Sequence, residues 1–308
     1  MARRRKGIPI HGWFNIDKPE GMTSTAVVSR IKRLTNAAKA GHGGTLDPMA
    51  TGVLPVALGE ATKTVAFAMD GIKEYLFHLR FGAETTTEDR EGAVTEESGV
   101  RPDAAAIRAV LPRFQGEIEQ VPPRFSAIKV AGERAYDLAR GGEDFELQPR
   151  RVTVHSLTLE GMDGADTAVL RCRCGKGTYV RSLGRDIARA LGALGHLTAL
   201  RRTAVGPFTE ATAISLDKLE AFGHSAPDSG HLLPVETALD DIPALALTEV
   251  EARRLTQGQP IAALPVVSRS PLRDISQGDV VSAMFGERLV ALAEIRGGEI
   301  RPVRVINL

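Results

Sequence analysis

The sequence is poor in cysteine, in aromatic residues and in long apolar runs. Its 308 residues include only two cysteines, and aromatic residues make up 5% of the chain. No apolar run approaches the roughly 18 residues that a membrane-spanning helix needs. With 43% hydrophobic and 25% charged residues, the composition is typical of soluble globular proteins. The basic start lacks the apolar stretch of a secretory signal, so we expect a cytoplasmic protein.

The two cysteines, Cys172 and Cys174, do not suffice for a metal site. They stand two positions apart in a stretch typical of a strand, so their side chains should share one face. No second cysteine pair or histidine cluster provides the further ligands that zinc needs. The sequence therefore favours two small buried residues in a reducing compartment over a disulfide or a metal centre.

Positive charge is not in excess overall, but it is concentrated in two segments. The net charge is +1, yet residues 170–206 carry eight Arg or Lys against one acid, and residues 30–63 carry five against two. Each segment alone is compatible with an ordinary solvated face. If they meet in space, they form a basic surface suited to a polyanion. Arg181, Arg185 and Arg189 recur every four residues, so a helix would align them in one row.

Hydrophobic periodicity predicts a mixture of helices and strands. Thr23 or Ser24 is expected to cap the first helix, and Pro102 should stand in the first turn of the third. Helices are predicted at residues 23–35, 60–71, 101–114, 179–192 and 247–261, and strands at residues 12–19, 73–82, 150–162 and 167–174.

Three less regular segments separate these elements. Residues 83–101 are charged and turn-rich, and we expect a surface loop there. Residues 121–150 contain few core-type runs and several basic residues, as an exposed arm would. Residues 221–241 are rich in Gly, Pro, Ser and acids, which indicates a linker or an irregular connection. Beyond it, short apolar strands alternate with Gly turns, so a compact β-rich C-terminal module is expected.

One carboxylate, Asp47, lies inside a run of small and apolar residues, GGTLDPMATGVLP at 43–55. Glycines let such a backbone turn tightly or approach a ligand closely. The spacing is not that of a phosphate-binding loop. From local pattern alone, Asp47 would cap a short helix over residues 49–53 with Pro48 at its first position, which is worth about 1 kcal/mol. A functional carboxylate is the alternative.

Several motifs together resemble one family. The stretch GHGGTLDPMATGVLP is similar to the signature of the TruB family of tRNA pseudouridine synthases. The segments NIDKPEGMTS, KEYLFHLRFGAETTTEDREG, PPRFSAIKVAGERAYDLAR and GKGTYVRSLGRDIA, the last followed by LGHLTALRRTAVGPF, match the family in the same order. The resemblance covers about residues 10–210.

The resemblance implies an α+β fold. A pseudouridine-synthase-like catalytic domain would be built on a mixed, largely antiparallel sheet with flanking helices, followed by a small β-rich, PUA-like C-terminal domain. We accordingly expect a basic flexible tail at 1–9, a catalytic domain at 10–240 with an RNA-binding arm at about 121–150, and the PUA-like domain at 241–308. The last matches the family less clearly, which leaves its part in tRNA docking open.

The resemblance also implies an isomerase that converts uridine 55 in the TΨC loop of tRNA to pseudouridine without cofactor or metal. Asp47 would be the catalytic carboxylate, as a nucleophile on the sugar or the base, or as the base that removes a sugar proton. Arg181 would form its ion pair, with an RNA phosphate as the alternative partner. Tyr75 would stack on the uracil and relay the C5 proton, although pattern alone makes it a core aromatic.

Five further residues are implied in substrate binding. Tyr179 and Leu200 would line the base pocket, although each alone would be assigned to the core. His42 would take up space vacated by flipped bases, or be an ordinary polar surface residue. Lys18, next to a proline, would support the active-site loop or contact phosphate. Arg202, together with the arm, would grip the RNA backbone.

The expected partner is the T-arm stem-loop of tRNA, bound by a monomer without an obligatory protein partner or a membrane. Two other functions fit the same residues. The protein could be a tRNA-folding helper whose useful act is opening the loop. Alternatively, the catalytic domain could modify a target defined by a guide RNA within a ribonucleoprotein.

Overall fold

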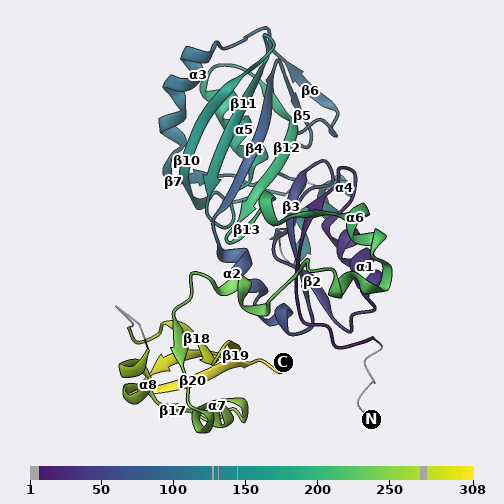
Figure 1. The fold of residues 1–308 in the computed structure, drawn as a ribbon. Helices are drawn as coiled ribbons and strands as arrows, with labels where there is room; N and C mark the ends of the chain where they lie inside the picture. Colours follow the sequence, from purple (N-terminus) through teal and green to yellow (C-terminus); the bar gives the residue numbers. More distant parts are fainter. Residues whose placement is uncertain (1–6, 127, 131, 144, 271–275) are drawn as a thin grey trace.

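A large mixed sheet forms the body of the molecule (Figure 1). The computed structural model describes residues 7–126, 128–130, 132–143, 145–270 and 276–308. Within these residues, eleven strands join the sheet, and β2 (Ala40–His42), β13 (Phe208–Thr209) and β15 (Leu232–Leu233) pair beside its main path. The main order is β14 (Ile214–Ser215), β1 (Gly12–Lys18), β3 (Thr51–Leu58), β12 (Gly195–Val205), β4 (Lys73–Phe81), β11 (Thr167–Cys174), β10 (Arg150–Asp163) and β7 (Gly116–Gln120).

The pairing confirms a mixed, largely antiparallel sheet. β1 and β14 run parallel, as do β3 and β12, whereas the other neighbours on the path are antiparallel. On β4, Tyr75, Phe77 and Leu79 alternate onto one buried face, as the period of a strand dictates. Cys172 and Cys174 on β11 are free and buried, as expected for two small buried residues.

Helices cover the sheet where the sequence predicts them. α1 (Ser24–Thr35) is capped by the preceding residue, Thr23, whose hydroxyl accepts from Ala26 N. α5 (Val180–Ala190) packs on β4 and β12 with Leu183 and Ile187 inward. Shorter helical turns complete the domain: η1 (Gly59–Lys63), α2 (Val65–Asp70), α3 (Ala104–Val110), η2 (Leu111–Phe114), η3 (Glu210–Thr212), α6 (Leu216–Ala221), η4 (Gly223–Asp228) and η5 (Val235–Leu239).

Two predicted helices differ in their bounds. The helix predicted at 60–71 is divided, because a 3-10 turn ends at Lys63 and α2 starts at Val65. The third helix begins after Asp103, whose side chain accepts from Ala106 N at 2.7 Å, so Pro102 precedes the helix instead of standing in its first turn. The Asp103 carboxylate accepts from a backbone amide in the first turn of the helix, which has no partner within the helix. A proline side chain has no acceptor atom for this amide.

The irregular segments contain more structure than expected. Residues 83–101 include a hairpin of β5 (Ala83–Thr85) and β6 (Val94–Glu97). The arm contains β8 (Lys129–Val130), β9 (Glu133–Arg134) and α4 (Ala135–Arg140).

Residues 221–241, predicted as a linker or an irregular connection, are packed against the sheet as an irregular connection. There β15 pairs with β1, and Trp13 Nε1 donates to the carbonyl of Val235 at 3.2 Å. The sequence pattern did not predict this packing, because the runs of apolar residues in this stretch are short and are separated by turn residues.

The C-terminal module is β-rich, as predicted. Its five-stranded sheet within the described residues has the order β16 (Ala244–Ala246), β18 (Val280–Phe285), β19 (Arg288–Arg296), β20 (Glu299–Val305) and β17 (Ile261–Ala262). α7 (Glu249–Thr256) starts with a capping box between Thr248 and Glu251. A second helix, α8 (Ala263–Arg269), was not predicted, because the proline in its first turn resembles a turn signal.

The N-terminal tail is only partly described. Residues 1–6 of the predicted flexible tail lie outside the described residues. Ile8 already pairs with the main body, because its amide donates to Asn36 O at 2.8 Å and it forms a bridge with Ala37. In the part of the chain that the structure describes, no helix is long and apolar enough to cross a membrane.

Candidate active site

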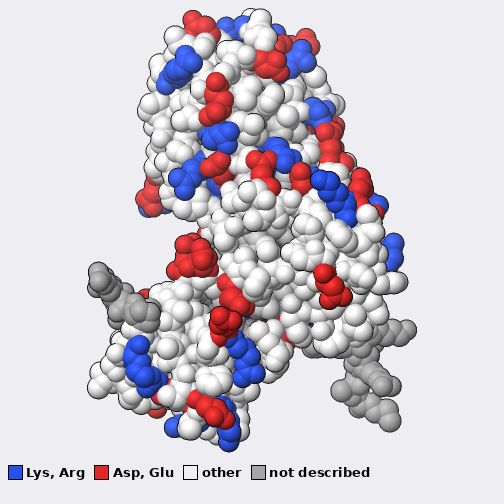
Figure 2. Space-filling view, in the orientation of Figure 1, with Lys and Arg blue, Asp and Glu red and all other residues white. Residues whose placement is uncertain are grey.

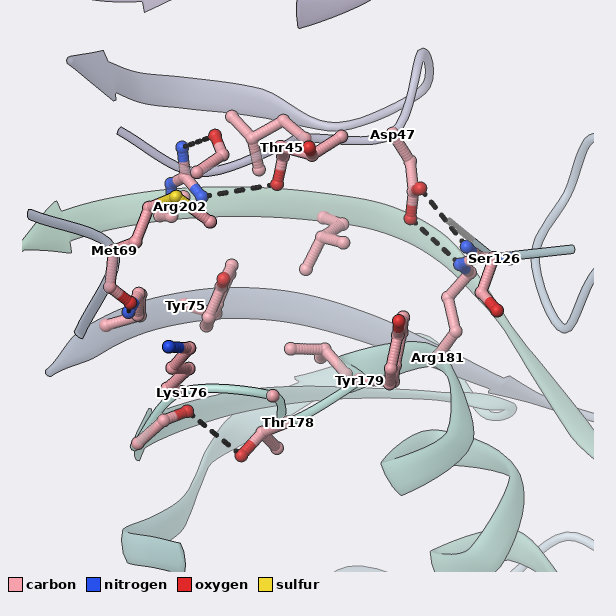
Figure 3. Close-up of a pocket in the computed structure, with 17 residues that line it drawn as sticks. Thr45, Asp47, Met69, Tyr75, Ser126, Lys176, Thr178, Tyr179, Arg181 and Arg202 are labelled. Atoms are coloured by element: carbon pink, nitrogen blue, oxygen red, sulfur yellow. Dashed lines mark hydrogen bonds and ion pairs between the residues drawn. The ribbon is translucent and has the colours of Figure 1, made fainter. Parts of the chain in front are cut away.

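A pocket of about 320 Å3 opens between the loop before β3, strands β4 and β12, and the start of α5 (Figure 3). Asp47, Arg181 and Ser126 lie at one end of it, Met69 and Arg202 lie at the other, and Tyr75 lies between (Figure 3). The fold thus joins segments that are far apart in sequence. Six of the eight predicted site residues line the pocket, namely Asp47, Tyr75, Tyr179, Arg181, Leu200 and Arg202.

Asp47 and Arg181 form the predicted ion pair. Arg181 Nε lies 2.9 Å from Asp47 Oδ2, and Arg181 Nη2 donates to Oδ1 at 3.1 Å. The Arg181 side chain is 5% exposed and that of Asp47 is 34% exposed. The guanidinium therefore holds the carboxylate in a two-point grip and leaves it open to the pocket.

The alternative interpretation of Asp47 as a helix cap is wrong. Residues 51–58 form the strand β3 and not a short helix. Asp47 stands instead in a turn in which Ala50 N donates to the Asp47 carbonyl at 3.1 Å. The side chain is thus free to point into the pocket, because no helix amide competes for it.

Arg181 is also held from its other side. Its guanidinium donates to the carbonyls of Thr87 and Phe125 at 2.9 and 3.0 Å, and it lies 3.7 Å from Asp89 Oδ2. Asp89 is buried and accepts from the amide of Glu91 at 3.0 Å. Asp89 was not among the predicted site residues, although it lies within one of the segments that resemble the family. These contacts fix the plane of the guanidinium and therefore the position of Asp47.

The arginines of α5 form the predicted row of guanidinium groups, but acidic side chains form ion pairs with them. Arg185 pairs with Glu88, and Arg189 pairs with Glu84 at 2.6 Å. Burial raises the pKa of Glu88, and the adjacent Arg185 opposes this rise. Over the face in Figure 2, basic and acidic side chains are interspersed. The expected basic surface along this row is therefore not formed, because residues 84–89 supply the counter-charges.

Tyr75, Tyr179 and Leu200 form apolar walls of the pocket. Burial raises the pKa of both tyrosines, so the phenols are neutral near pH 7. The backbone of Tyr179 is fixed on both sides by Gln120, which accepts from its amide at 2.8 Å and donates to its carbonyl at 3.1 Å. Such walls suit a flat, aromatic ligand.

Lys18 and Arg202 do not face solvent, which corrects their predicted substrate contacts. Lys18 is 0% exposed, and its Nζ donates to the carbonyls of Pro19 at 2.8 Å and Pro48 at 3.1 Å. Burial lowers its pKa to about 8. Of the two predicted roles for Lys18, support of the active-site loop agrees with the structure, and contact with phosphate does not.

Arg202 is 1% exposed and also binds the loop. It donates to the carbonyls of Val53 at 2.8 Å and Gly44 at 3.0 Å. A side chain enclosed in this way cannot grip an RNA backbone. Its position follows from the pairing of β12 with β3, which directs it beneath the loop.

His42 lies on β2, next to the pocket. It is not one of the described residues that line the pocket. Its Nδ1 is buried and has no hydrogen-bond partner within the described parts of the chain. Burial lowers its pKa, and Arg202 contributes to the decrease. The predicted place of His42 beside flipped bases stays a prediction.

Comparison with known families places these residues in a wider context. Residues 32–180 match the description "TruB family pseudouridylate synthase (N terminal domain)", and residues 181–240 match "tRNA pseudouridylate synthase B C-terminal domain". The two matches are contiguous and include every residue that lines the pocket.

Full-length relatives carry related names. The chain is 58% identical to tRNA pseudouridine synthase B of Rhodospirillum rubrum over all of both chains, and 58% identical to that of a Caulobacter species with the same coverage. A solved structure of an H/ACA RNP bound to a substrate RNA containing 2′-deoxyuridine contains a chain of the same fold. The TM-score is 0.75 at 27% identity, covering 100% of this chain and 92% of the other.

Proposed function

Since the chain belongs to the TruB family of pseudouridylate synthases, it is an isomerase that forms pseudouridine in tRNA, and we propose that its target is uridine 55 of the TΨC loop. The reaction breaks the bond from N1 to C1′ and joins C5 to C1′, so no atom enters or leaves the nucleoside. The proton that leaves C5 is balanced by one that N1 gains.

The observation that carries the proposed chemistry is the Asp47–Arg181 pair at one end of the pocket. Among the described residues that line the pocket, Asp47 is the one acidic residue, and its carboxylate is partly exposed beside the aromatic walls. Asp47 acts either as a nucleophile on C1′ or on the base, or as the base that removes a sugar proton. In each route Arg181 holds the same carboxylate in place.

Tyr75 is proposed to stack on the uracil. Its ring lies in the pocket on the side of Arg202 and Met69, facing the end that holds Asp47 (Figure 3). Because burial raises the pKa of its phenol, a proton relay through Tyr75 must use the neutral hydroxyl as both acceptor and donor. A phenolate base is not required in this scheme.

The uridine must leave its folded loop to enter this pocket. A volume of about 320 Å3 lies at the small end of the range for ligand sites, which suits one extruded nucleoside. His42, at the end of β2 just before the loop that carries Asp47, is proposed to occupy space that flipped bases vacate.

The arm is proposed to hold the RNA backbone outside the pocket. Arg140 stacks over the exposed ring of Tyr136 at 5.1 Å. An exposed aromatic ring with a cation can bind single-stranded RNA without reading its sequence. Together with the C-terminal domain, which we place at 241–308 after the catalytic domain at 10–240, the arm would let a cytoplasmic monomer bind the T-arm.

Replacement of the carboxylate tests this proposal. Asp47→Asn is expected to reduce pseudouridine formation on an unmodified T-arm stem-loop by at least about a hundredfold, while leaving RNA affinity largely unchanged. The matched control is Asp17→Asn, which removes another Asp–Arg pair, with Arg201, at 3.0 Å and outside the pocket. Full activity of Asp47→Asn would end the proposed mechanism.

One alternative is modification of a target defined by a guide RNA. It is favoured by the solved neighbour within an H/ACA RNP, but that chain is 27% identical, whereas tRNA pseudouridine synthase B of Rhodospirillum rubrum is 58% identical. Turnover of unmodified tRNA by the purified protein alone is expected. Turnover that depends on an added guide RNA would favour the alternative.

A further inference from the structure

A hydroxyl group beside the Asp47–Arg181 pair has no hydrogen-bond partner among the residues that the structure describes. Ser126 lines the pocket and is 5% exposed. Its Oγ is buried and makes no hydrogen bond within the described parts of the chain. Buried polar groups are almost always paired, and an exception inside a pocket indicates a missing ligand. Figure 3 places Ser126 at the same end of the pocket as Asp47 and Arg181.

The backbone of Ser126 is nevertheless held firmly. The preceding carbonyl, that of Phe125, accepts from Arg181 Nη2 at 3.0 Å. The carbonyl of Ser126 itself accepts from the amide of Tyr136 at 3.0 Å. The first contact is charge-assisted and ties the arm to the catalytic ion pair. Only rotation about the Cα–Cβ bond remains, and it moves the hydroxyl among the three staggered positions.

The surroundings of this hydroxyl are polar on one side and aromatic on the other. Burial raises the pKa of the Tyr179 phenol, and the Ser126 hydroxyl, which lies close enough to favour the ionised phenol, offsets part of that rise. Ser126 Oγ nevertheless makes no hydrogen bond of good geometry to this phenol among the described residues, so the serine hydroxyl stays unsatisfied. A third group placed between them and Asp47 would need to donate and accept hydrogen bonds. A sugar hydroxyl has this capacity, as serine itself has.

We propose that Ser126 Oγ binds the 2′-hydroxyl of the target ribose. The inference rests on the proposed function, in which Asp47 acts within one or two bonds of C1′. Because C2′ is bonded to C1′, its hydroxyl must lie in the same end of the pocket as the carboxylate. The uracil then extends over Tyr75 toward Met69 (Figure 3). Ser126 therefore distinguishes a ribonucleotide from a deoxyribonucleotide at this position.

The test compares two T-arm stem-loops that differ only in carrying uridine or 2′-deoxyuridine at the target. Dissociation constants are measured in the Asp47→Asn background, with and without Ser126→Ala, so that no turnover is needed. The Asp47→Asn protein is expected to bind the uridine RNA about three- to tenfold more tightly than the deoxyuridine RNA. Ser126→Ala should reduce this ratio to about one by weakening the uridine complex alone.

Thr178→Val is the matched control. Thr178 lines the same pocket, but its hydroxyl already donates to the carbonyl of Gly175 at 3.2 Å. The ratio should therefore persist in this variant. A ratio that Ser126→Ala leaves unchanged overturns the inference, as does equal weakening of both RNAs with a lower thermal midpoint, which would assign Ser126 a structural role. Either result leaves pseudouridine formation by the unaltered protein as a separate test of the proposed function.

Discussion

At the scale of single residues, three buried cations determine the position of one carboxylate, that of Asp47. Arg181 binds Asp47 directly, whereas Lys18 and Arg202 bind backbone carbonyls of the loop that carries it. A buried cation is costly unless polar groups surround it, and here carbonyl dipoles provide that environment. The basic residues around Asp47 thus stabilise the site from within and do not form its RNA-binding surface.

His42 should make stability depend on pH. Burial lowers its pKa below the usual 6.5, so the folded protein takes up this proton at a lower pH than the unfolded chain does. Well above pH 6.5 both states are neutral at this residue. As the pH falls below 6.5, the unfolded chain is protonated first, and the free energy of unfolding decreases.

Urea unfolding of the unaltered protein and of His42→Gln at pH 7.5, 6.5 and 5.5 measures this effect. The variant is expected to gain stability relative to the unaltered protein as the pH falls. His155→Gln, at an exposed position of β10, is the control and should follow the unaltered protein. Parallel pH profiles for His42→Gln and the unaltered protein would contradict the prediction.

At the scale of elements, the site depends on a close approach between β3 and β12. The two strands pair in parallel at Gly52 and Arg202, and this register directs the arginine side chain beneath the Asp47 loop. Gly52 has a φ of 97°, and a Cβ there would overlap the carbonyl oxygen of Arg202. No residue other than glycine fits both the conformation and the space.

Gly52→Ala is therefore expected to destabilise the protein by at least about 2 kcal/mol, from the strained φ and the steric overlap together. Gly41→Ala is the matched control, because its Cβ would have nothing within 4 Å. Guanidinium unfolding of both variants measures the difference. Equal stability of the two variants would show that β3 and β12 can separate without cost.

At the scale of the whole molecule, the C-terminal sheet shares a hydrophobic cluster with the large sheet. Leu289, Leu292 and Ile306 are buried together with Trp13 and Phe208. Two polar contacts accompany the cluster: Lys63 Nζ donates to Val305 O at 2.7 Å, and Asn307 N donates to Glu60 Oε2 at 2.8 Å. We expect the two domains to be coupled in orientation and in stability.

Leu292→Ala should lower the free energy of unfolding by about 2–4 kcal/mol, because it leaves a cavity between the domains. Val303→Ala, at an exposed position of β20, is the control and should have little effect. Calorimetry is expected to show one cooperative transition for the unaltered protein. Two separate transitions, with Leu292→Ala affecting only one of them, would show that the domains unfold independently.

Much of this protein follows from its sequence. The alternation of apolar residues predicted β4, β10 and β11, and cap residues predicted the start of α1. Both signals are local, because a strand or a helix end is specified by neighbours in the chain. The family resemblance in turn singled out Asp47, Tyr75 and Arg181, which the fold brings to one pocket.

The tertiary structure alone decided which charged groups are available to a ligand. Arg202 belongs to the basic segment at 170–206 and Lys18 lies outside both basic segments, yet both side chains are buried. The arginine row of α5 is paired with acids from residues 84–89. Likewise, only the tertiary structure shows that the Ser126 hydroxyl has no hydrogen-bond partner among the described residues. Partner choice and burial depend on residues far apart in the chain, such as Arg181 and Asp47 at a separation of 134 positions. Local sequence patterns carry no signal for such contacts, because the fold and not the chain brings the two groups together.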